Sequence, residues 1–220
     1  MMKIDKGSKL LFIGDSITDF GRFRPVGEAP VGLGTGYVML LEGMLTGYFP
    51  DRQIRVVNAG VGGDTIRHLE ARWQSDVIDQ KPGWVAVMIG INDVWRHFDN
   101  PFKPELAVGY EEYVSTYRKL IEVSLPQVKG MVLMTPFYID GNTGDPMTSM
   151  VHRYADAVRQ LALEYHLVFC DVQAEFDETQ KQLHHMAFSA DRVHPNMNNP
   201  VGHFIIVKAF LKSIGAWPVL

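Results

Sequence analysis

The chain contains 220 residues, a length that suits one α/β domain and is short for two. Apolar residues make up 46% and charged residues 21% of the sequence, a balance that excludes a disordered or fibrous chain. The formal net charge is −4 and the basic residues are scattered, so we expect no nucleic-acid partner. The composition predicts a single domain over residues 1–220.

Cysteine content and hydropathy indicate the cellular compartment in which the protein is expected. Cys170 is the only cysteine, which excludes an intramolecular disulfide and a cysteine zinc site. The first apolar run, residues 10–13, is too short for the core of a signal peptide, and no window approaches the roughly 18 apolar residues of a membrane span. We therefore expect a cytoplasmic protein without a membrane partner.

Five short apolar runs predict β-strands. They are rich in β-branched residues and lack polar alternation, which is typical of strands covered on both faces and favours a parallel sheet. The runs span residues 10–13, 54–57, 84–89, 131–134 and 167–170.

Segments with helical periodicity lie between these runs. Apolar side chains recur at helical spacing within residues 110–121 and 151–165. Asp64 and Thr65 offer an N-cap for another helix, and Pro200 leads into a last one. Such alternation predicts a flavodoxin-like, doubly wound five-stranded parallel sheet with helices on both faces.

The predicted sheet brings several polar turns to one edge. Residues 14–18, 58–64 and 90–93 each follow a predicted strand, and all three turns lie at the carboxyl end of the sheet. In the strand order 2-1-3-4-5 these turns are neighbours. A fourth polar cluster, residues 191–195, precedes the last helix and is expected to fold over that edge. The Gly- and Pro-rich stretch 19–35 is the long irregular loop of the chain.

The polar turns contain the residue types of a serine hydrolase. A serine hydroxyl needs a base within hydrogen-bond reach, and that base needs a third group to orient it. Ser16 is the candidate nucleophile and His194 the base; Asp191 is three residues from His194, close enough to fix its tautomer. The Ser16 amide, the Gly63 amide and the Asn92 side chain are candidate donors to an oxyanion.

These residues resemble the four sequence blocks of the SGNH (GDSL) hydrolases. The blocks are Gly14-Asp15-Ser16, the Gly63 turn, Gly90-Ile91-Asn92-Asp93 and Asp191-x-x-His194-Pro195, in the family's order. The usual leucine of the first block is Ile17 here. The resemblance implies the SGNH-hydrolase fold and hydrolysis by a Ser16, His194 and Asp191 triad.

Three longer stretches are similar to the intracellular bacterial acetylxylan esterases. They span residues 11–19, 88–96 and 133–141. This resemblance implies removal of acetyl groups from imported xylo-oligosaccharides by a homo-oligomeric enzyme that uses no metal and no other cofactor.

Candidate substrate-binding residues lie beside the blocks. Trp95 follows the Asn92 block and can stack on a sugar, although core packing explains it equally well. Tyr138 is a comparable candidate. Asp15 is a third, with a structural role as its alternative, and Asp93 is interpreted as a structural partner of the loops.

Other readings of the motifs are weaker or remain open. The Gly60 to Gly63 cluster breaks the dinucleotide-binding pattern at Thr65, and His184-His185 lacks further ligands at metal spacing. The same triad also suits other short-chain acyl esters, thioesters or lipids. A non-catalytic sugar- or nucleotide-binding module would bind without turnover.

Overall fold

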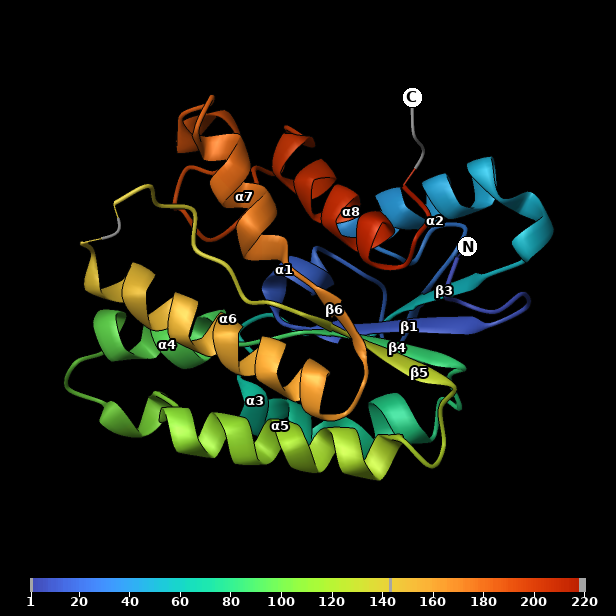
Figure 1. Cartoon of the computed structure of the whole chain (residues 1–220), viewed down its shortest axis with the longest axis horizontal. Coiled ribbons are helices and arrows are strands. Elements are labelled where there is room, and N and C mark those ends of the chain that lie inside the picture. The colour runs from blue at the N-terminus through green and yellow to red at the C-terminus, as the bar shows by residue number, and fades with distance from the viewer. Residues whose placement is uncertain (1, 143, 218–220) are drawn as a thin grey trace.

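One sheet with helices on both faces makes up the part of the chain that the computed structural model describes, residues 2–142 and 144–217 (Figure 1). Within those residues the strands are β1 (Lys9–Gly14), β2 (Gly27–Glu28), β3 (Arg55–Asn58), β4 (Trp84–Met88), β5 (Gly130–Met134) and β6 (Val168–Cys170). Their order across the sheet is β2-β3-β1-β4-β5-β6. The α/β fold with its doubly wound, mostly parallel sheet is therefore confirmed.

The predicted strands pair in the predicted order. β1 lies between β3 and β4 and is parallel to both, with Phe12 opposite Asn58 and Gly14 opposite Met88. β5 and β6 continue the parallel ladder beyond β4. The polar turns after β1, β3 and β4 therefore meet at one edge, as the sequence predicts.

A sixth strand corrects the prediction of five. β2 lies within the irregular 19–35 loop and pairs antiparallel with β3 at the edge of the sheet. The ladder joins only two residues, Gly27 to Asn58 and Glu28 to Val57, and an Arg55 Nη2 to Glu28 Oε1 contact of 2.7 Å reinforces it. A strand this short has no hydrophobic run of its own, so tertiary pairing decides it.

The helices form two layers. The helices are α1 (Ser16–Asp19), α2 (Tyr37–Tyr48), α3 (Ile66–Trp73), α4 (Ile91–Asp99), α5 (Tyr110–Ser124), α6 (Pro146–Glu164), α7 (Val172–Gln180) and α8 (Val201–Ser213). α2, α7 and α8 pack together over one face of the sheet, and α3, α4, α5 and α6 cover the other (Figure 1). Short 3₁₀ turns occupy Pro50–Arg52, Pro104–Leu106 and His185–Ala187, and a π-helical turn, Gln74–Ile78, extends α3.

The helix predictions succeed where a clear apolar stripe exists. α5, α6 and α8 correspond to the three predicted segments, and α3 begins at Ile66 with Thr65 as its N-cap. The Thr65 amide donates to His68 Nδ1 at 3.1 Å, which completes a capping box. The sequence reading misses α2, whose consecutive apolar residues 37–41 hide the periodicity, and the short helices α4 and α7.

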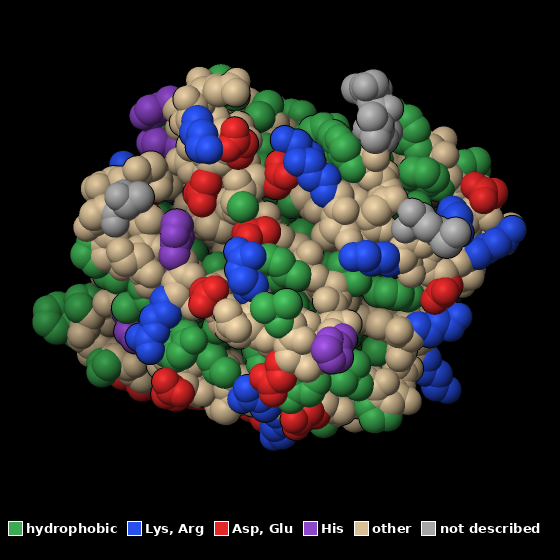
Figure 2. All heavy atoms as spheres, viewed as in Figure 1, with side chains coloured by type: hydrophobic (Ala, Val, Ile, Leu, Met, Phe, Trp, Pro, Cys, Tyr) green, Lys and Arg blue, Asp and Glu red, His purple; other side chains and the backbone are tan. Residues whose placement is uncertain are grey.

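Among the described residues, none of the helices combines the length and the apolar composition that a bilayer crossing needs. Basic and acidic side chains are interspersed over the face shown in Figure 2, with no continuous basic band on it.

Aromatic packing joins the sheet to its helical layers. Phe12 of β1 is fully buried, with its ring centroid 5.8 Å from that of Tyr37 on α2 and 5.1 Å from that of Phe210 on α8. On the other face, Tyr113 and Tyr117 of α5 are fully buried. The central strand that carries the site is therefore fixed by large side chains.

The Phe12→Ala variant should lower the free energy of unfolding by about 3 to 5 kcal/mol, because it removes a buried ring and leaves a cavity between β1, α2 and α8. Urea denaturation measures the change. The Phe102 side chain is 96% exposed, so Phe102→Ala is the matched control and should change stability by less than about 0.5 kcal/mol. Equal losses in the two variants would contradict this account of the core.

Candidate active site

Ser16 stands at the junction between the central strand and a short helix. It is the first residue of α1, and Asp15 caps that helix by accepting the Ile17 amide at 2.9 Å. The turn is tight: a Cβ placed on Gly14 would lie 2.3 Å from the Met88 carbonyl oxygen of β4. The strand end thus holds the Ser16 side chain at the carboxyl edge of the sheet.

Ser16, His194 and Asp191 form one hydrogen-bonded chain. Ser16 Oγ lies 2.8 Å from His194 Nε2, and His194 Nδ1 lies 2.7 Å from Asp191 Oδ2. A carboxylate only accepts hydrogen bonds, so Nδ1 carries the proton and Nε2 is free to accept the hydroxyl proton of Ser16. The three residues that the sequence predicted together are in contact across 178 positions of chain.

The loop that carries Asp191 and His194 is fixed from both sides. Asp191 Oδ1 accepts the backbone amides of Val193 at 2.9 Å and His194 at 2.7 Å. The intervening Arg192 adopts a left-handed φ of 66°, and its carbonyl accepts the Ile139 amide at 2.8 Å. The segment after β5 therefore anchors the turn that aims the imidazole at Ser16.

Hydrogen bonding sets the charges within this chain of contacts. The hydrogen bond to Asp191 raises the pKa of His194 above its ordinary value of 6.5, an effect that outweighs the desolvation of the ring. Burial raises the pKa of Asp191, but hydrogen bonds from His194 and Val193 outweigh it and hold that pKa well below the usual range. Asp191 therefore stays ionised beside an imidazole that is a stronger base than a free one.

The turn after β3 passes next to Ser16. Gly60 is packed so tightly that a Cβ there would lie 2.4 Å from the Asp19 amide nitrogen, and Gly63 has a φ of 82° that favours glycine. A Cβ placed on Gly62 would lie 3.9 Å from the Cβ of Ser16. None of the described residues accepts a hydrogen bond from the Gly63 amide.

Asn92 extends toward the same turn from α4. Its Nδ2 donates to the Asp64 carbonyl at 3.0 Å, and its Oδ1 accepts from Arg96 Nη2 at 3.2 Å. This arrangement orients the amide so that its second N–H is available. The structure thus brings the turns that carry Ser16, Gly63 and Asn92 to one edge of the sheet, and the Asn92 amide bonds to the residue after Gly63.

Asp93 and Asp15 are buried below this edge. Asp93 is fully buried, and its Oδ1 accepts the Ile66 amide at 2.9 Å at the start of α3, the contact expected of a structural partner of the loops. Burial raises the pKa of each of these two carboxyls to about 7.

Two arginines that the sequence reading did not single out also hold the turns. The Arg72 guanidinium donates to Asp64 Oδ2 at 2.7 Å, to the Ala59 carbonyl at 2.7 Å and to the Gly14 carbonyl at 3.1 Å. Arg22 is 5% exposed and donates to the Gly60 carbonyl at 2.6 Å. Neither arginine belongs to a motif, because each one binds backbone carbonyls of distant segments, and Arg72 also binds the Asp64 carboxylate.

A pocket of about 560 Å³ opens beside Ser16 and His194. Its other walls come from the irregular loop, with Phe20, and from the segment after the triad loop, with Pro195 and Met197. Most of the lining is apolar. An ester can therefore reach Ser16 through this open pocket, against walls that are mostly apolar.

The three candidate substrate-binding residues differ in position. The Trp95 ring is half-buried against the core, and its centroid lies 6.0 Å from that of His194, so both of its suggested roles keep support. Asp15 is 1% and Tyr138 9% exposed, and none of the three, Trp95 included, is among the described residues that line the pocket. All three assignments stay predictions.

Over residues 2–142 and 144–217, the structure contains no group of at least three His, Cys, Asp or Glu side chains placed to hold a metal ion. The rings of His184 and His185 pack against each other with centroids 4.2 Å apart.

Comparisons with known proteins agree with this geometry. The model of the GDSL-like lipase/acylhydrolase family matches residues 12–198. The acetylxylan esterase of Geobacillus stearothermophilus is 53% identical over 215 residues, which cover 97% of each chain. The crystal structure of that enzyme, Axe2, superposes with a TM-score of 0.94 over 97% of both chains.

Further solved structures extend the likeness. Three are catalytic mutants of Axe2 in which a serine, a histidine or an aspartate is replaced by alanine, each with a TM-score of 0.94, 52% identity and 97% coverage of both chains. LAE5, an alpha/beta hydrolase from the metagenome of Lake Arreo in Spain, is 43% identical with a TM-score of 0.95 over all of both chains.

An NMR titration of the His194 ring should give a pKa above 6.5, and the Asp191→Asn variant should move it down, because the amide removes the charge and the strongest hydrogen bond that favour imidazolium. The transition of Glu164, whose pKa is held below its ordinary value by the hydrogen bond from Arg118 between α5 and α6, should not move. A His194 pKa that stays unchanged in the variant would contradict this electrostatic assignment.

Proposed function

The chain belongs to the GDSL-like lipase/acylhydrolase family, and from this membership and the site geometry we propose that it is a serine esterase that removes acetyl groups from xylo-oligosaccharides. One observation carries the proposal: Ser16 Oγ is 2.8 Å from His194 Nε2 while His194 Nδ1 is 2.7 Å from Asp191. The acetylxylan esterase relative supplies the substrate class.

Acylation follows from this hydrogen-bonded chain. His194 Nε2 takes the Ser16 proton as Oγ attacks the carbonyl carbon of the acetyl ester, and Asp191 stabilises the imidazolium that forms. The bond from the carbonyl carbon to the sugar oxygen then breaks, and His194 returns the proton to that oxygen. The deacetylated sugar leaves, and the acetyl group stays on Ser16.

Deacylation repeats the sequence with water as the nucleophile. His194 removes a proton from water, the hydroxide attacks the acetyl-serine carbonyl, and acetate leaves as Ser16 regains its proton. In both steps the Ser16 amide, the Gly63 amide and the Asn92 side chain are the proposed donors to the oxyanion. Because His194 must be neutral to accept a proton, the rate should fall as the pH drops through its raised pKa.

The pocket suits an acetylated sugar better than a bare acetyl group. Its volume of about 560 Å³ leaves room for sugar rings beside the ester carbonyl. Trp95, next to His194, offers an aromatic face for stacking, while Tyr138 and Asp15 complete the proposed set of substrate-binding residues.

A second candidate function keeps the mechanism and changes the acyl group. The apolar walls at Phe20, Pro195 and Met197 also suit longer acyl esters, thioesters or lipids. The 53% identity with an acetylxylan esterase favours the acetyl substrate.

Assembly and compartment complete the proposal. We infer a homo-oligomer, supported by apolar side chains left at the surface of the α2 and α8 layer, where Phe204 is 45% and Met39 40% exposed. Trp217 is half-buried and packs against Phe204 with ring centroids 6.2 Å apart. We also propose a cytoplasmic location, consistent with a single free cysteine, Cys170, in the core.

The wild-type protein should release acetate from acetylated xylo-oligosaccharides and should hydrolyse acetyl esters faster than butyryl or octanoyl esters. Ser16→Ala should retain at most about one part in 10³ of the wild-type kcat, because it removes the nucleophile. Acetate assays and chromogenic esters of increasing chain length provide the measurements. Near-normal turnover by Ser16→Ala would refute the mechanism, and a preference for octanoyl esters would replace the acetyl substrate by the second candidate.

The protein should have a solution mass that is a multiple of the 24.8 kDa chain, measured by light scattering at micromolar concentration. Replacing Phe204 by Glu should shift that mass downward, since a charge at the apolar surface opposes association. A wild-type mass of one chain would remove the oligomer from the proposal.

A further inference from the structure

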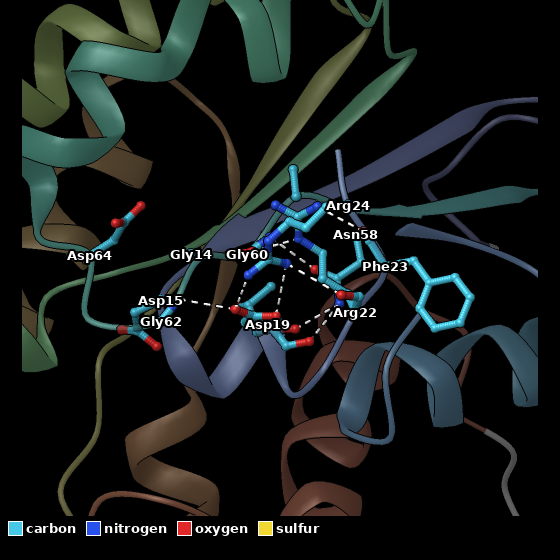
Figure 3. A network of polar contacts seen from close by, with 12 residues as sticks. Gly14, Asp15, Asp19, Arg22, Phe23, Arg24, Asn58, Gly60, Gly62 and Asp64 are labelled. Carbon is cyan, nitrogen blue, oxygen red and sulfur yellow. Dashed lines mark hydrogen bonds and ion pairs between the residues drawn. The ribbon is translucent and has the colours of Figure 1, made fainter. Parts of the chain in front are cut away.

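Asp19 joins the end of α1 to the turn that carries Gly63. Its Oδ2 accepts the Gly62 amide at 3.1 Å and also lies 2.6 Å from Arg24 Nη2. Its Oδ1 accepts a hydrogen bond from Arg24 Nη1 at 3.1 Å, so the arginine contacts both carboxylate oxygens (Figure 3). One carboxylate thus contacts the irregular loop and the turn after β3.

The hydrogen bond to the Gly62 amide restrains the neighbouring amide, which is the proposed oxyanion donor. Gly62 immediately precedes Gly63, and a glycine pair has wide backbone freedom unless hydrogen bonds restrain it. Asp19 fixes the Gly62 N–H, and Asn92 fixes the Asp64 carbonyl on the other side at 3.0 Å. The Gly63 amide between these two contacts is therefore held in one direction without being used by another described residue.

Arg24 compensates the negative charge that Asp19 places beside the turn. The Asp19 side chain is only 14% exposed, so its charge is weakly screened, and a free carboxylate beside the turn would oppose a negative oxygen at Ser16. Burial raises the pKa of Asp19, but Arg24 and the Gly62 amide outweigh it and bring that pKa below its ordinary value. The carboxylate is thus ionised, and its charge is compensated by the bidentate arginine.

Arg22 keeps Arg24 in place. Its guanidinium donates to the Phe23 carbonyl at 3.1 Å and the Pro25 carbonyl at 2.6 Å, on either side of Arg24, and to the Gly60 carbonyl at 2.6 Å. The loop is therefore tied to the same turn that Asp19 holds, and Arg24 faces Asp19 from a fixed backbone.

We propose that Asp19 is a positioning residue that aims the Gly63 amide at the oxyanion, and that Arg24 neutralises Asp19 so that this contact does not oppose the developing negative charge. The inference rests on the proposed esterase mechanism. It assigns the Asp19 and Arg24 pair to the turnover step and not to substrate binding.

Three variants separate this role from a structural one. Asp19→Ala removes the acceptor of the Gly62 amide and should lower kcat by about 10- to 100-fold, less than the loss of a whole oxyanion donor, with KM within about twofold. Arg24→Gln leaves an unpaired carboxylate and should lower kcat about tenfold. The double variant Asp19→Asn with Arg24→Gln restores a neutral acceptor and an uncharged partner, so its kcat should exceed that of Arg24→Gln alone.

Steady-state kinetics on a chromogenic acetyl ester measure these effects, and thermal unfolding checks that each variant folds. Glu164→Gln is the matched control, because it removes the exposed Arg118 to Glu164 ion pair, in which Arg118 Nη2 lies 2.9 Å from Glu164 Oε2 on the outer helices α5 and α6. It should leave kcat unchanged. Ser16→Ala is assayed in parallel.

The pattern of outcomes identifies which idea fails. If Ser16→Ala abolishes turnover while Arg24→Gln keeps wild-type kcat, or while the double variant is no faster than Arg24→Gln, the positioning inference is overturned and the esterase proposal stands. If Ser16→Ala itself keeps turnover, the proposed function fails first. The comparison of Arg24→Gln with the double variant remains decisive even where Asp19→Ala does not fold.

Discussion

Parallel pairing of β1 with β3 on one side and β4 on the other is the constraint on which the site depends. The register places Phe12 beside Asn58 and Gly14 beside Met88, so three strands end at the same edge. At that edge each strand is followed by a polar turn, because the backbone beyond it makes no further ladder hydrogen bonds. Residues that are distant in sequence therefore share one small volume.

Buried polar contacts turn this neighbourhood into a defined geometry. Asn58 is fully buried and donates to the Thr18 carbonyl at 2.7 Å and the Leu33 carbonyl at 2.9 Å, so it ties α1 and the irregular loop to β3. Arg72 and Asp93 hold the ends of the Gly63 turn. Such groups are costly to bury without hydrogen bonds, and the bonds that are made hold the backbone rigidly, although Asp93 Oδ2 has no partner among the described residues. These contacts thus restrict the backbone conformation of the glycines at the turn whose amide donors must point at one position.

Particular elements show why parts of the fold could be predicted and others not. The five parallel strands were readable because strands covered on both faces are continuously apolar, and α5 because its stripe repeats at 3.6 residues. β2 was missed because its two-residue ladder exists only when β3 is already beside it. Arg22, Arg72 and Asp19 were missed as site-forming residues because they bind backbone groups of other segments, which leave no trace in local sequence.

The sequence by itself determined the chemical identities: a serine after the first strand, glycines after the second, an asparagine after the third, and an aspartate three residues before a histidine. The local spacing also predicted the Asp191 to His194 contact, since a turn of three residues can bring the carboxylate to the imidazole. Only the tertiary structure decided that Ser16 Oγ lies 2.8 Å from His194 Nε2 and that Asp19 holds the Gly62 amide. Those distances follow from strand register and from loops crossing one another, and such long-range geometry is set by packing of the whole chain and not by any one segment.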